Sequence, residues 1–563
     1  MLLHGLLAWF REHPQYQSLR DELRAGLELP SQSLLPTAIP PTFAALSGDL
    51  AAPLLIVTPT TTESRRLTQA LQGTWLAQPE RLLTFPPPPV LPYERAPWTP
   101  ETISDRLRVL ATLFLWRVGA ADGTAPPLII TSVRALLRRP LPYRQFRRAA
   151  RKIERGMRIP LAGLARHCRG SGYETVSVVE APGQISHRGG ILDIFPPQSP
   201  HPYRLDFFGD ELDVIRAFDP ATQRSTGRVA SFWLTPVREA LPRDGAHALP
   251  ALRAHLEGDL PPELQGPFTE DLQFLAAGVP FPTLEFYLPL LYQESSTLVD
   301  YLPPDAQIIL CNADAILQRW AELEAEAQEA RRRALEEHVL LPDTALPYVS
   351  RESWQATLKG RRVLAFSPGE TGPLAATFAP EPHFAGRLGE ALGHLRQWVG
   401  LGDQVVVVSR QAARLAELWQ EFTPPPVYEG LAEPPETLIT FVQGVASGGW
   451  QLSLPHLTRH LITDEELFGW RPPEPRRRPR RRVATPELPF ADLQPGSAVV
   501  HEDYGIGIFQ GLARCTIENV EREYLMLEYA NSDRLYVPIQ QADRLTPYVG
   551  SESLGPRLSR LGS

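Results

Sequence analysis

The chain has 563 residues, too many for one hydrophobic core, because single cores stop growing at roughly 250 to 300 residues and several modules are then expected. A content of 43% hydrophobic and 21% charged residues excludes a disordered protein. The formal net charge of −8 excludes a global basic field, so nucleic-acid binding would have to come from a local patch.

Cysteine usage and hydropathy exclude further classes of protein. Cys168, Cys311 and Cys515 lie far apart and form no CxxC pair, so the sequence predicts neither a disulfide framework nor a cysteine zinc site. No uncharged apolar run approaches the roughly 20 residues that a membrane helix needs. The apolar start, Met1 to Phe10, lacks a basic lead-in and a cleavage site, and we interpret it as an amphipathic first helix. We therefore expect a soluble, cytoplasmic protein that does not enter a membrane.

The first half of the chain predicts a parallel α/β module followed by an antiparallel β module. Pro53 to Leu71 has the pattern of a buried strand, a polar turn and an amphipathic helix, and Pro127 to Leu137 repeats it. Between them lies a helix start that Thr99 or Thr102 could cap. From about Ser177 the hydrophobic period changes to two, which is typical of antiparallel strands. The expected strands are Ile191 to Phe195, Tyr203 to Phe207 and Leu212 to Phe218.

The second half predicts a long helix and another α/β module. Ala321 to Leu340 is rich in Glu, Ala and Arg, which indicates a solvent-facing helix that connects two domains. The next module is expected from about Arg362 to Gly469. Its predicted strands are Val363 to Phe366 and Val405 to Val408, with a helix at Ala412 to Phe422.

Two segments of the β module carry a family resemblance. Residues 188 to 196, RGGILDIFP, and residues 203 to 211, YRLDFFGDE, are similar to the domain that UvrB shares with bacterial transcription-repair coupling factors. The resemblance implies docking on the excision-repair ATPase UvrA, with Arg188, Arg204 and Phe208 at the matching contact positions. Arginines beside an exposed aromatic suit an interface, since both are enriched at binding hot spots. The alternative is a core Phe208 with solvated turn arginines.

A third region of resemblance lies near the end of the chain, between residues 496 and 548. Apolar and polar residues alternate in this region, which predicts a small all-β barrel with a hairpin turn at residues 530 to 533. VVHEDYGIG at 499 to 507, EYLMLEYA at 523 to 530 and LYVP at 535 to 538 resemble the RNA polymerase interaction domain shared by CarD regulators and coupling factors. The resemblance implies a Tudor-like or SH3-like barrel that pairs with the polymerase β subunit. The expected contact strand carries Leu512, Arg514, Cys515 and Ile517, with glycines nearby that could admit another backbone. The alternative is a structural barrel with glycines at bulges.

The remaining resemblance concerns the α/β part. LPYE at 91 to 94, Arg106-Leu107, FYLPL at 286 to 290 and DYLP at 300 to 303 are similar to the two pieces of the UvrB-like domain that flank the docking insert. No GxxxxGK[ST] loop is present, because the only lysines, Lys152 and Lys359, follow no glycine loop. We therefore expect no nucleotide-binding site, no catalytic residue and no cofactor in this chain, which favours a coupling factor over UvrB.

Two further patterns imitate functional sites. TDEEL at 463 to 467 imitates the Mg²⁺ motif of a helicase, but without a phosphate-binding lysine it has no nucleotide to serve, so we assign it to structure. His456 and His460 have the metal-ligand spacing of a helix face, yet the glutamate of HExxH is missing and the surrounding leucines indicate a strand. We expect no metal site.

An arginine-rich and proline-rich segment, RPPEPRRRPRRR at 471 to 482, precedes the barrel. Such a segment either grips nucleic-acid phosphates or forms a solvated, self-repelling linker, and its prolines favour the linker. The nucleic-acid reading would use Arg476, Arg477, Arg478, Arg480, Arg481 and Arg482.

Together these patterns predict a multidomain α/β and β protein. The expected modules are a UvrB-like α/β domain in two parts (1–140 and 236–345, the second with the connecting helix), a β-rich UvrA-binding insert (141–235), a second α/β domain (346–470), an Arg/Pro-rich linker (471–488) and a CarD-like domain (489–555). The expected function is that of a non-enzymatic adaptor, without the motor of the intact family, that binds stalled RNA polymerase and recruits UvrA. The alternatives are an ATP-dependent DNA translocase and a standalone CarD-like transcription regulator.

Overall fold

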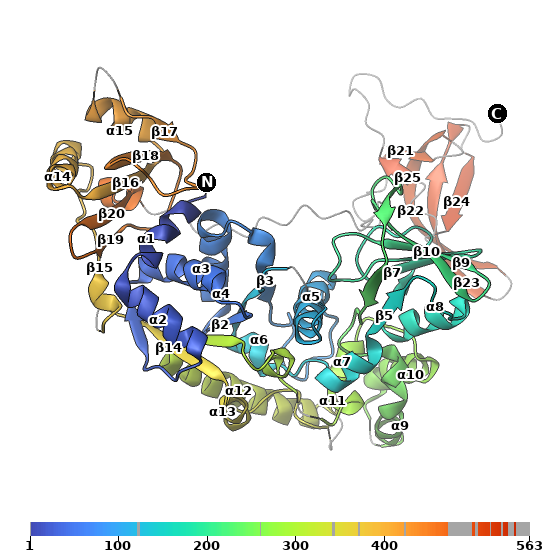
Figure 1. The fold of residues 1–563 in the computed structure, drawn as a ribbon. Coiled ribbons are helices and arrows are strands. Elements are labelled where there is room, and N and C mark those ends of the chain that lie inside the picture. Colours follow the sequence, from blue (N-terminus) through green and yellow to red (C-terminus); the bar gives the residue numbers. More distant parts are fainter. Residues whose placement is uncertain are drawn as a thin grey trace. The chain divides into compact units, whose positions relative to one another are not determined.

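The computed structural model describes residues 2–120, 124–258, 260–294, 296–340, 344–369, 372–420, 424–470, 498–501, 505–517, 520–530, 533–538 and 545–547. They belong to two compact units, 1–472 and 473–563, which we describe separately. Several sheets with packed helices make up the described residues (Figure 1). The predicted mixed α/β and β, multidomain character is thereby confirmed.

The first sheet of unit 1–472 is six-stranded and parallel, in the order β1-β14-β13-β2-β4-β3. The central strands β2 and β4 are apolar over most of their length and fully buried, because both faces of the sheet are covered. Leu55, Ile129 and Ile308 enter one core, whereas their neighbours Ile56 and Ile309 enter another. The strands are β1 (Gln32–Leu34), β2 (Leu54–Thr58), β3 (Leu82–Phe85), β4 (Leu128–Ser132), β13 (Gln307–Cys311) and β14 (Arg362–Pro368).

Two helices of this part of the chain, at residues 61–70 and 100–117, begin at side-chain caps that the sequence offers. Thr60 and Glu63 form a capping box on α4, and the Thr99 hydroxyl accepts a hydrogen bond from the Thr102 amide at 3.3 Å, as one of the two predicted caps requires. The helices are α1 (Leu7–Arg11), α2 (Pro14–Ala25), α3 (Ile39–Asp49), α4 (Thr61–Ala70), α5 (Pro100–Arg117), α6 (Val133–Leu137), α7 (Tyr143–Ala149), α9 (Leu249–Leu256), α10 (Pro262–Ala277), α11 (Leu288–Leu291), α12 (Ala313–Glu336) and α13 (Arg351–Leu358).

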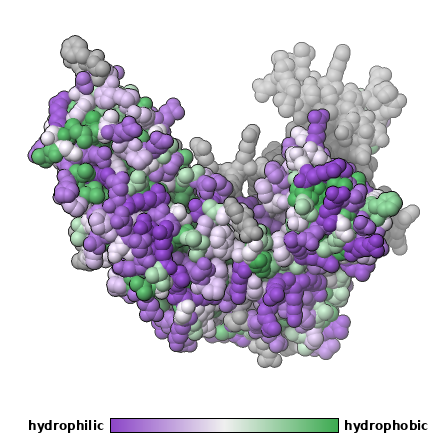
Figure 2. Space-filling view, viewed as in Figure 1, coloured by the Kyte–Doolittle hydropathy of each residue, from purple (hydrophilic) through white to green (hydrophobic). Residues whose placement is uncertain are grey.

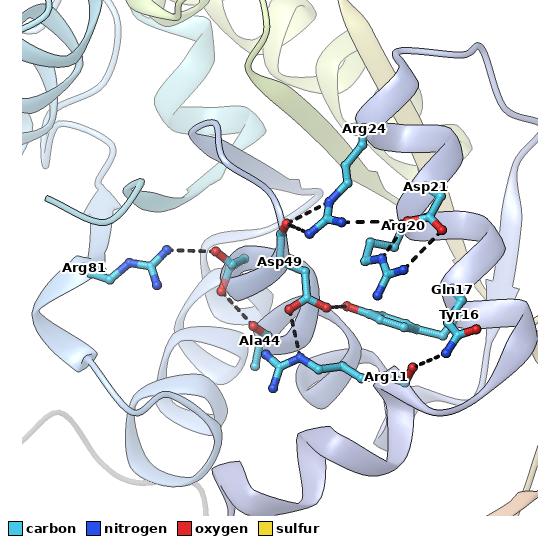
Figure 3. A network of polar contacts seen from close by, with 10 residues as sticks. Arg11, Tyr16, Gln17, Arg20, Asp21, Arg24, Ala44, Asp49 and Arg81 are labelled. Atoms are coloured by element: carbon cyan, nitrogen blue, oxygen red, sulfur yellow. Dashed lines mark hydrogen bonds and ion pairs between the residues drawn. The ribbon is translucent and has the colours of Figure 1, made fainter. Parts of the chain in front are cut away.

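The N-terminal segment is more buried than an amphipathic surface helix. Trp9 and Phe10 on α1 pack their rings against Trp450, at centroid distances of 6.2 and 5.3 Å. Helix α2 is tied to α3 by Asp49, whose carboxylate accepts hydrogen bonds from the Tyr16 hydroxyl at 2.9 Å and the Arg11 guanidinium at 2.8 Å (Figure 3). The start of the chain therefore joins the first sheet to the second α/β sheet.

The second α/β sheet has the order β15-β19-β20-β16-β18-β17, with parallel pairing except at β19. The predicted strand at Val405 to Val408 lies in it and is fully buried. Its elements are β15 (Phe378–Ala379), β16 (Gln404–Ser409), β17 (Val427–Tyr428), β18 (Ile439–Gln443), β19 (Trp450–Ser453), β20 (Thr458–Thr463), α14 (Leu388–Leu401), α15 (Ala412–Trp419) and α16 (Asp464–Phe468).

Two expectations for this half of the chain are wrong. The strand at Val363 to Phe366 was placed in the second α/β module, but β14 pairs with β13 and β1 in the first sheet. The long helix α12 connects β13 to β14 of the same sheet and not two domains. Its predicted solvent-facing stretch from residue 321 onward is mostly exposed, whereas Trp320, which precedes that stretch, is fully buried and stacks on Trp354 at 5.1 Å. The charged residues fill only the outer side of this helix, and the tryptophan and leucine positions cover the first sheet.

The β-rich insert forms an antiparallel sheet in the order β11-β10-β9-β8-β7-β6, with only β6 and β7 parallel. The three strands predicted from the period of two are all present. The elements are β6 (Glu174–Thr175), β7 (Gln184–Arg188), β8 (Ile191–Ile194), β9 (Tyr203–Phe208), β10 (Glu211–Phe218), β11 (Ser225–Arg228), the separate pair β5 (Arg151–Glu154) and β12 (Ser231–Leu234), and α8 (Leu161–Gly170).

The described part of unit 473–563 is a five-stranded antiparallel sheet in the order β24-β23-β22-β21-β25. Val499, Phe509, Leu525, Leu527 and Tyr529 form most of its core. The strands are β21 (Ala498–His501), β22 (Gly505–Ile517), β23 (Val520–Glu528), β24 (Arg534–Pro538) and β25 (Leu545–Pro547). Among the described strands no pair closes this sheet into a barrel. Within the described ranges, no helix is both long and apolar enough to cross a bilayer.

Candidate protein-docking sites

Two hairpin turns lie side by side at one end of the insert sheet. The β7–β8 turn contains Gly189, with φ of 58°, and the β9–β10 turn contains Gly209, with φ of 61°, a backbone conformation that glycine adopts without strain. The Phe207 amide donates to the Gly190 carbonyl at 2.9 Å and so joins the two hairpins. Residues that flank these turns therefore share one edge of the insert.

Strand register places all three predicted docking residues on one face of this sheet. Leu205 and Leu192 point into the insert core, and side chains alternate along a strand, so Arg204 and Phe208 on β9 lie on the opposite, outer face. Arg188 pairs with Ile191, and Ile191 pairs with Asp206 of β9, which brings Arg188 to the same face. We call this face, with Arg188, Ile191, Arg204 and Phe208, the insert face.

The insert face exposes apolar side chains. Phe208 is 86% exposed, more than any other large hydrophobic residue described, and Ile191 is 38% exposed. Figure 2 shows hydrophobic surface over this part of the molecule, bordered by hydrophilic residues. The reading of Phe208 as a core residue is therefore wrong. An exposed aromatic beside arginines has the composition of an interface hot spot.

Arg204 is held in place by contacts within the insert. Its guanidinium forms two hydrogen bonds of 2.8 Å with the Asp193 carboxylate on β8, the strand position directly opposite. It also lies over the Phe218 ring at 4.7 Å. The ion pair raises the pKa of Arg204, and its bidentate geometry fixes the side chain. Arg204 therefore has a structural role in addition to any contact with a partner.

Arg188 is exposed and makes a simpler contact. Its guanidinium donates to the Ser177 carbonyl, and among the described residues no carboxylate forms an ion pair with it. Sequence reasoning missed Ile191 as a member of this face, and it missed two ion pairs beside it, Arg204 with Asp193 at 2.8 Å and Arg216 with Asp206 at 2.9 Å. The period of two in residues 191 to 207 predicts which side chains of one strand share a face. Which residues of neighbouring strands lie beside each other follows only from the pairing register of the strands.

The predicted polymerase-contact residues all lie on β22. Its first part pairs with β21 from Gly505 to Ile508. Its second part, which carries Leu512, Arg514, Cys515 and Ile517, pairs with β23 through residue 517. Among the described strands, none pairs with residues 509 to 517 on the side opposite β23. We call this stretch the β22 edge.

The glycines near the β22 edge have local structural causes. A Cβ on Gly507 would lie 3.1 Å from the Tyr529 ring, so glycine lets this tyrosine pack into the core. Gly511, with φ of 128°, lies at the register shift that follows Phe509, which is a β-bulge. The alternative reading of the glycines as structural is supported at these two positions.

The segments that imitate other sites are structural where they are described. Glu466 accepts hydrogen bonds from the Thr463 amide at 2.9 Å and the Gly449 amide at 2.8 Å, so it caps α16 and joins it to β19. His460 lies on β20, as the strand interpretation required, and its ring bonds Glu381 at 2.9 Å and stacks on Trp398 at 4.2 Å. The arginine run of residues 476 to 482 lies outside the described residues.

Comparisons with known proteins connect these surfaces to two interaction domains. A family described as the UvrB interaction domain matches residues 152–239, and a family described as the CarD-like/TRCF RID domain matches residues 493–549. The first match contains the insert face and the second contains the β22 edge.

Three relatives that align with nearly the whole of this chain are transcription-repair-coupling factors. The chain is 31% identical to the transcription-repair-coupling factor of Myxococcus xanthus, 28% to that of Bacillus subtilis and 27% to that of Haemophilus influenzae. These alignments cover 96, 97 and 90% of this chain, but 47, 47 and 44% of the relatives. The chain thus spans about half the length of the curated relatives it matches, and corresponds to their N-terminal part.

Proposed function

We propose that this chain, as the counterpart of the N-terminal part of a transcription-repair coupling factor, is an adaptor that binds RNA polymerase and recruits UvrA. The observation that carries the proposal is the presence, in one chain, of a UvrB interaction domain and a CarD-like domain. The first carries an exposed aromatic residue beside arginines, and the second has a stretch of strand that pairs with a described strand on one side only. Joining two partners through separate modules needs no chemistry in the adaptor itself.

The insert face is the proposed UvrA-binding site. Phe208 would supply the aromatic anchor, and Arg188 would supply charge that can pair with a partner carboxylate. Arg204 would act partly by contact and partly by holding β8 and β9 in register through Asp193. This arrangement is supported by the exposure of Phe208 and by the shared strand face.

The β22 edge is the proposed site for the polymerase β subunit. Unpaired amide and carbonyl groups along a strand edge are a template for another strand. We propose that a strand of the β subunit pairs with residues 512 to 517, where Leu512, Arg514, Cys515 and Ile517 lie. We also propose that the complete domain is a Tudor-like or SH3-like barrel, of which the five described strands form the wall.

The proposed adaptor does not hydrolyse ATP, because a nucleotide site needs a phosphate-binding loop and neither Lys152 nor Lys359 follows a glycine loop. The translocase of an intact coupling factor and a standalone CarD-like regulator remain the competing functions. DNA-stimulated ATP hydrolysis by this chain would favour the first. Promoter-complex stabilisation without UvrA binding would favour the second.

The experiment is a pair of pull-downs with the purified chain, one with UvrA and one with core RNA polymerase, in buffer without nucleotide. We expect both partners to be retained. A matched sample of residues 1–472 should retain UvrA and lose the polymerase, because the CarD-like match begins at residue 493. Retention of the polymerase by residues 1–472 would contradict the assignment of the β22 edge.

A further inference from the structure

A small cavity in unit 1–472 is lined by the segments LPYE and FYLPL, whose role the proposed adaptor function leaves open. Its walls include Tyr93 and Glu94 of the first segment and Phe286 and Leu288 of the second. Arg138, directly after α6, and Thr344 also line it, together with Arg139, Glu285, Tyr292 and Glu294. We call it the Arg138 pocket. Its lining contains no residue of the insert face or of the β22 edge.

Three buried polar atoms without a hydrogen-bond partner of regular geometry belong to residues that line this pocket. They are the Arg138 Nη1, the Thr344 hydroxyl and the Tyr93 hydroxyl, although the nearby Arg331 guanidinium also interacts with Tyr93 and lowers its pKa against the effect of burial. Only 9% of Arg138, 6% of Tyr93 and 5% of Thr344 is exposed. Buried polar groups are nearly always bonded. Three such groups on one pocket therefore indicate a ligand, and all three can donate a hydrogen bond.

Arg138 is a surplus buried cation. The nearby Glu239 is already engaged, because it forms the buried ion pair with Arg106 and accepts the Leu141 amide at 3.3 Å. Burial and the neighbouring Arg106 lower the pKa of Arg138 to about 10, so it stays charged at neutral pH. A buried charge without a partner is costly, and an anion would remove that cost.

The carboxylates of the pocket are bound elsewhere. Glu94 accepts the Leu91 amide at 2.8 Å, Glu285 pairs with Arg238, and Glu294 lies 4.0 Å from Arg144. Arg139 donates to the Tyr348 carbonyl at 3.1 Å. In the described residues, Arg138 is thus the lining cation left for a ligand.

The backbone presents Tyr93 to the pocket in an unusual way. Tyr93 has φ of 68°, in the left-handed region that residues other than glycine, asparagine and aspartate rarely adopt. The Glu94 carboxylate closes the turn onto Leu91, and the Arg331 guanidinium lies 5.8 Å from the Tyr93 ring centre. Strain of this kind persists where the surroundings fix a functional position.

The volume of the pocket limits the ligand. The cavity is about 30 Å³, enough for two waters or one small planar group, since one water needs roughly 10 to 15 Å³. Arg138 also lines a second pocket of about 230 Å³, whose wall combines apolar residues such as Leu91, Leu137, Leu323 and Ala330 with the charged residues Arg134, Glu326, Glu329 and Arg333. A carboxylate in the first pocket can pair with Arg138, and a short aliphatic group can contact the apolar part of the second.

We propose that the Arg138 pocket binds a single carboxylate group, which accepts hydrogen bonds from Arg138, Tyr93 and Thr344. The carboxylate is either that of a small free acid or that of an aliphatic acid whose tail enters the second pocket. This site is independent of the proposed docking on UvrA and RNA polymerase.

The test uses the full chain and ¹³C-labelled formate, with binding read from the formate line width in NMR at constant ionic strength. Formate should bind the wild-type chain. Arg138→Met should weaken binding by about tenfold or more, because a charge-assisted hydrogen bond is lost. Tyr93→Phe should weaken it by roughly threefold to tenfold. The matched control is Arg414→Met on α15, which removes a cation whose side chain is 67% exposed, lines neither pocket and should leave binding unchanged.

Thermal unfolding in formate-free buffer gives a second readout. Arg138→Met should unfold at the same or a higher temperature than the wild type, because removing an unpartnered buried charge is neutral or stabilising. A lower temperature would show that Arg138 has a structural partner and would overturn the proposal. Equal formate binding by wild type and Arg138→Met would show adventitious surface binding. No binding to the wild type would show that the pocket holds water only.

Isovalerate separates the two sources of the carboxylate. Tighter binding of isovalerate than of formate, lost in Arg138→Met, supports an aliphatic acid that uses both pockets. Equal binding of the two acids, again lost in Arg138→Met, supports a small free carboxylate.

Discussion

The docking that we propose for the insert face and for the β22 edge would use two different kinds of contact. On the insert face the groups available to a partner are side chains, above all Phe208, which is 86% exposed, because every strand there is paired from β6 to β11. On the β22 edge the available groups are backbone amides and carbonyls of residues 509 to 517. A partner of the insert face would contact side chains, whereas a partner of the β22 edge would pair with the backbone of the strand.

This difference predicts opposite responses to mutation. A side-chain interface loses affinity when a single anchor is truncated, since few residues carry most of the binding energy. A strand-pairing interface tolerates truncation but fails when pairing itself is blocked, for example by a charge on the edge. Variants of the two surfaces therefore test whether the contrast is real.

The largest effect is expected for a charge on the β22 edge. Leu512→Asp should lower the affinity for RNA polymerase by about 100-fold, or about 3 kcal/mol, because charged side chains on an edge strand oppose pairing. Leu512→Ala should cost less than about 1 kcal/mol, since the backbone remains available. Binding is measured by biolayer interferometry. Equal losses of affinity in the two variants would show that the polymerase contacts the side chains of this strand instead of pairing with its backbone.

Truncation of the aromatic anchor should have the next largest effect. Phe208→Ala should weaken UvrA binding by about 2 to 3 kcal/mol, the range of an interface hot spot. The free energy of unfolding should change by less than about 0.5 kcal/mol, because the side chain is exposed. Leu401→Ala is the matched control, as Leu401 is 71% exposed on another module. Isothermal titration with UvrA gives the affinities, and a loss in the control equal to that in Phe208→Ala would refute the assignment.

Arg204 should affect both affinity and stability. Arg204→Ala should lower the free energy of unfolding by about 1 to 3 kcal/mol, because it leaves the nearly buried Asp193 carboxylate unpaired. Adding Asp193→Ala should restore much of the stability without restoring UvrA affinity, as a double-mutant cycle can show. Denaturant unfolding and UvrA titration are the measurements. Full recovery of affinity in the double variant would mean that Arg204 acts only through β8 and β9.

The smallest effect is expected for Arg188. Arg188→Ala should weaken UvrA binding by about 0.5 to 1 kcal/mol, in keeping with an exposed charge, and the loss should shrink at high salt. Its thermal unfolding should match that of the wild type. A salt-independent loss would point to a buried contact instead of a charge at the rim.

The elements of the fold were predictable where the pattern is local. Continuous apolar runs found β2, β4 and β16, and the period of two found β8 to β10. The sheet to which a strand belongs is not a local property, which is why the sequence predicts β14 in the wrong module. The same limit applies to α12, which the sequence predicts to connect two domains although the strands on either side of it, β13 and β14, pair in one sheet.

The candidate sites show the same limit. Alternation in YRLDFF is enough to put Arg204 and Phe208 on one face of β9, but the bidentate partner Asp193 follows only from the register of β8 with β9. Likewise, the sequence of β22 predicts a strand without showing which of its sides is free. The Arg138 pocket was not predicted, because its lining comes from segments more than 200 residues apart.

The central claim, that one chain joins UvrA to RNA polymerase without ATP hydrolysis, is tested most directly by mass photometry of the three purified proteins in nucleotide-free buffer. A ternary complex is predicted with the wild-type chain. Phe208→Ala should leave only the complex with polymerase, and Leu512→Asp only the complex with UvrA. Binary complexes alone with the wild-type chain, or a ternary complex that both variants retain, would contradict the account.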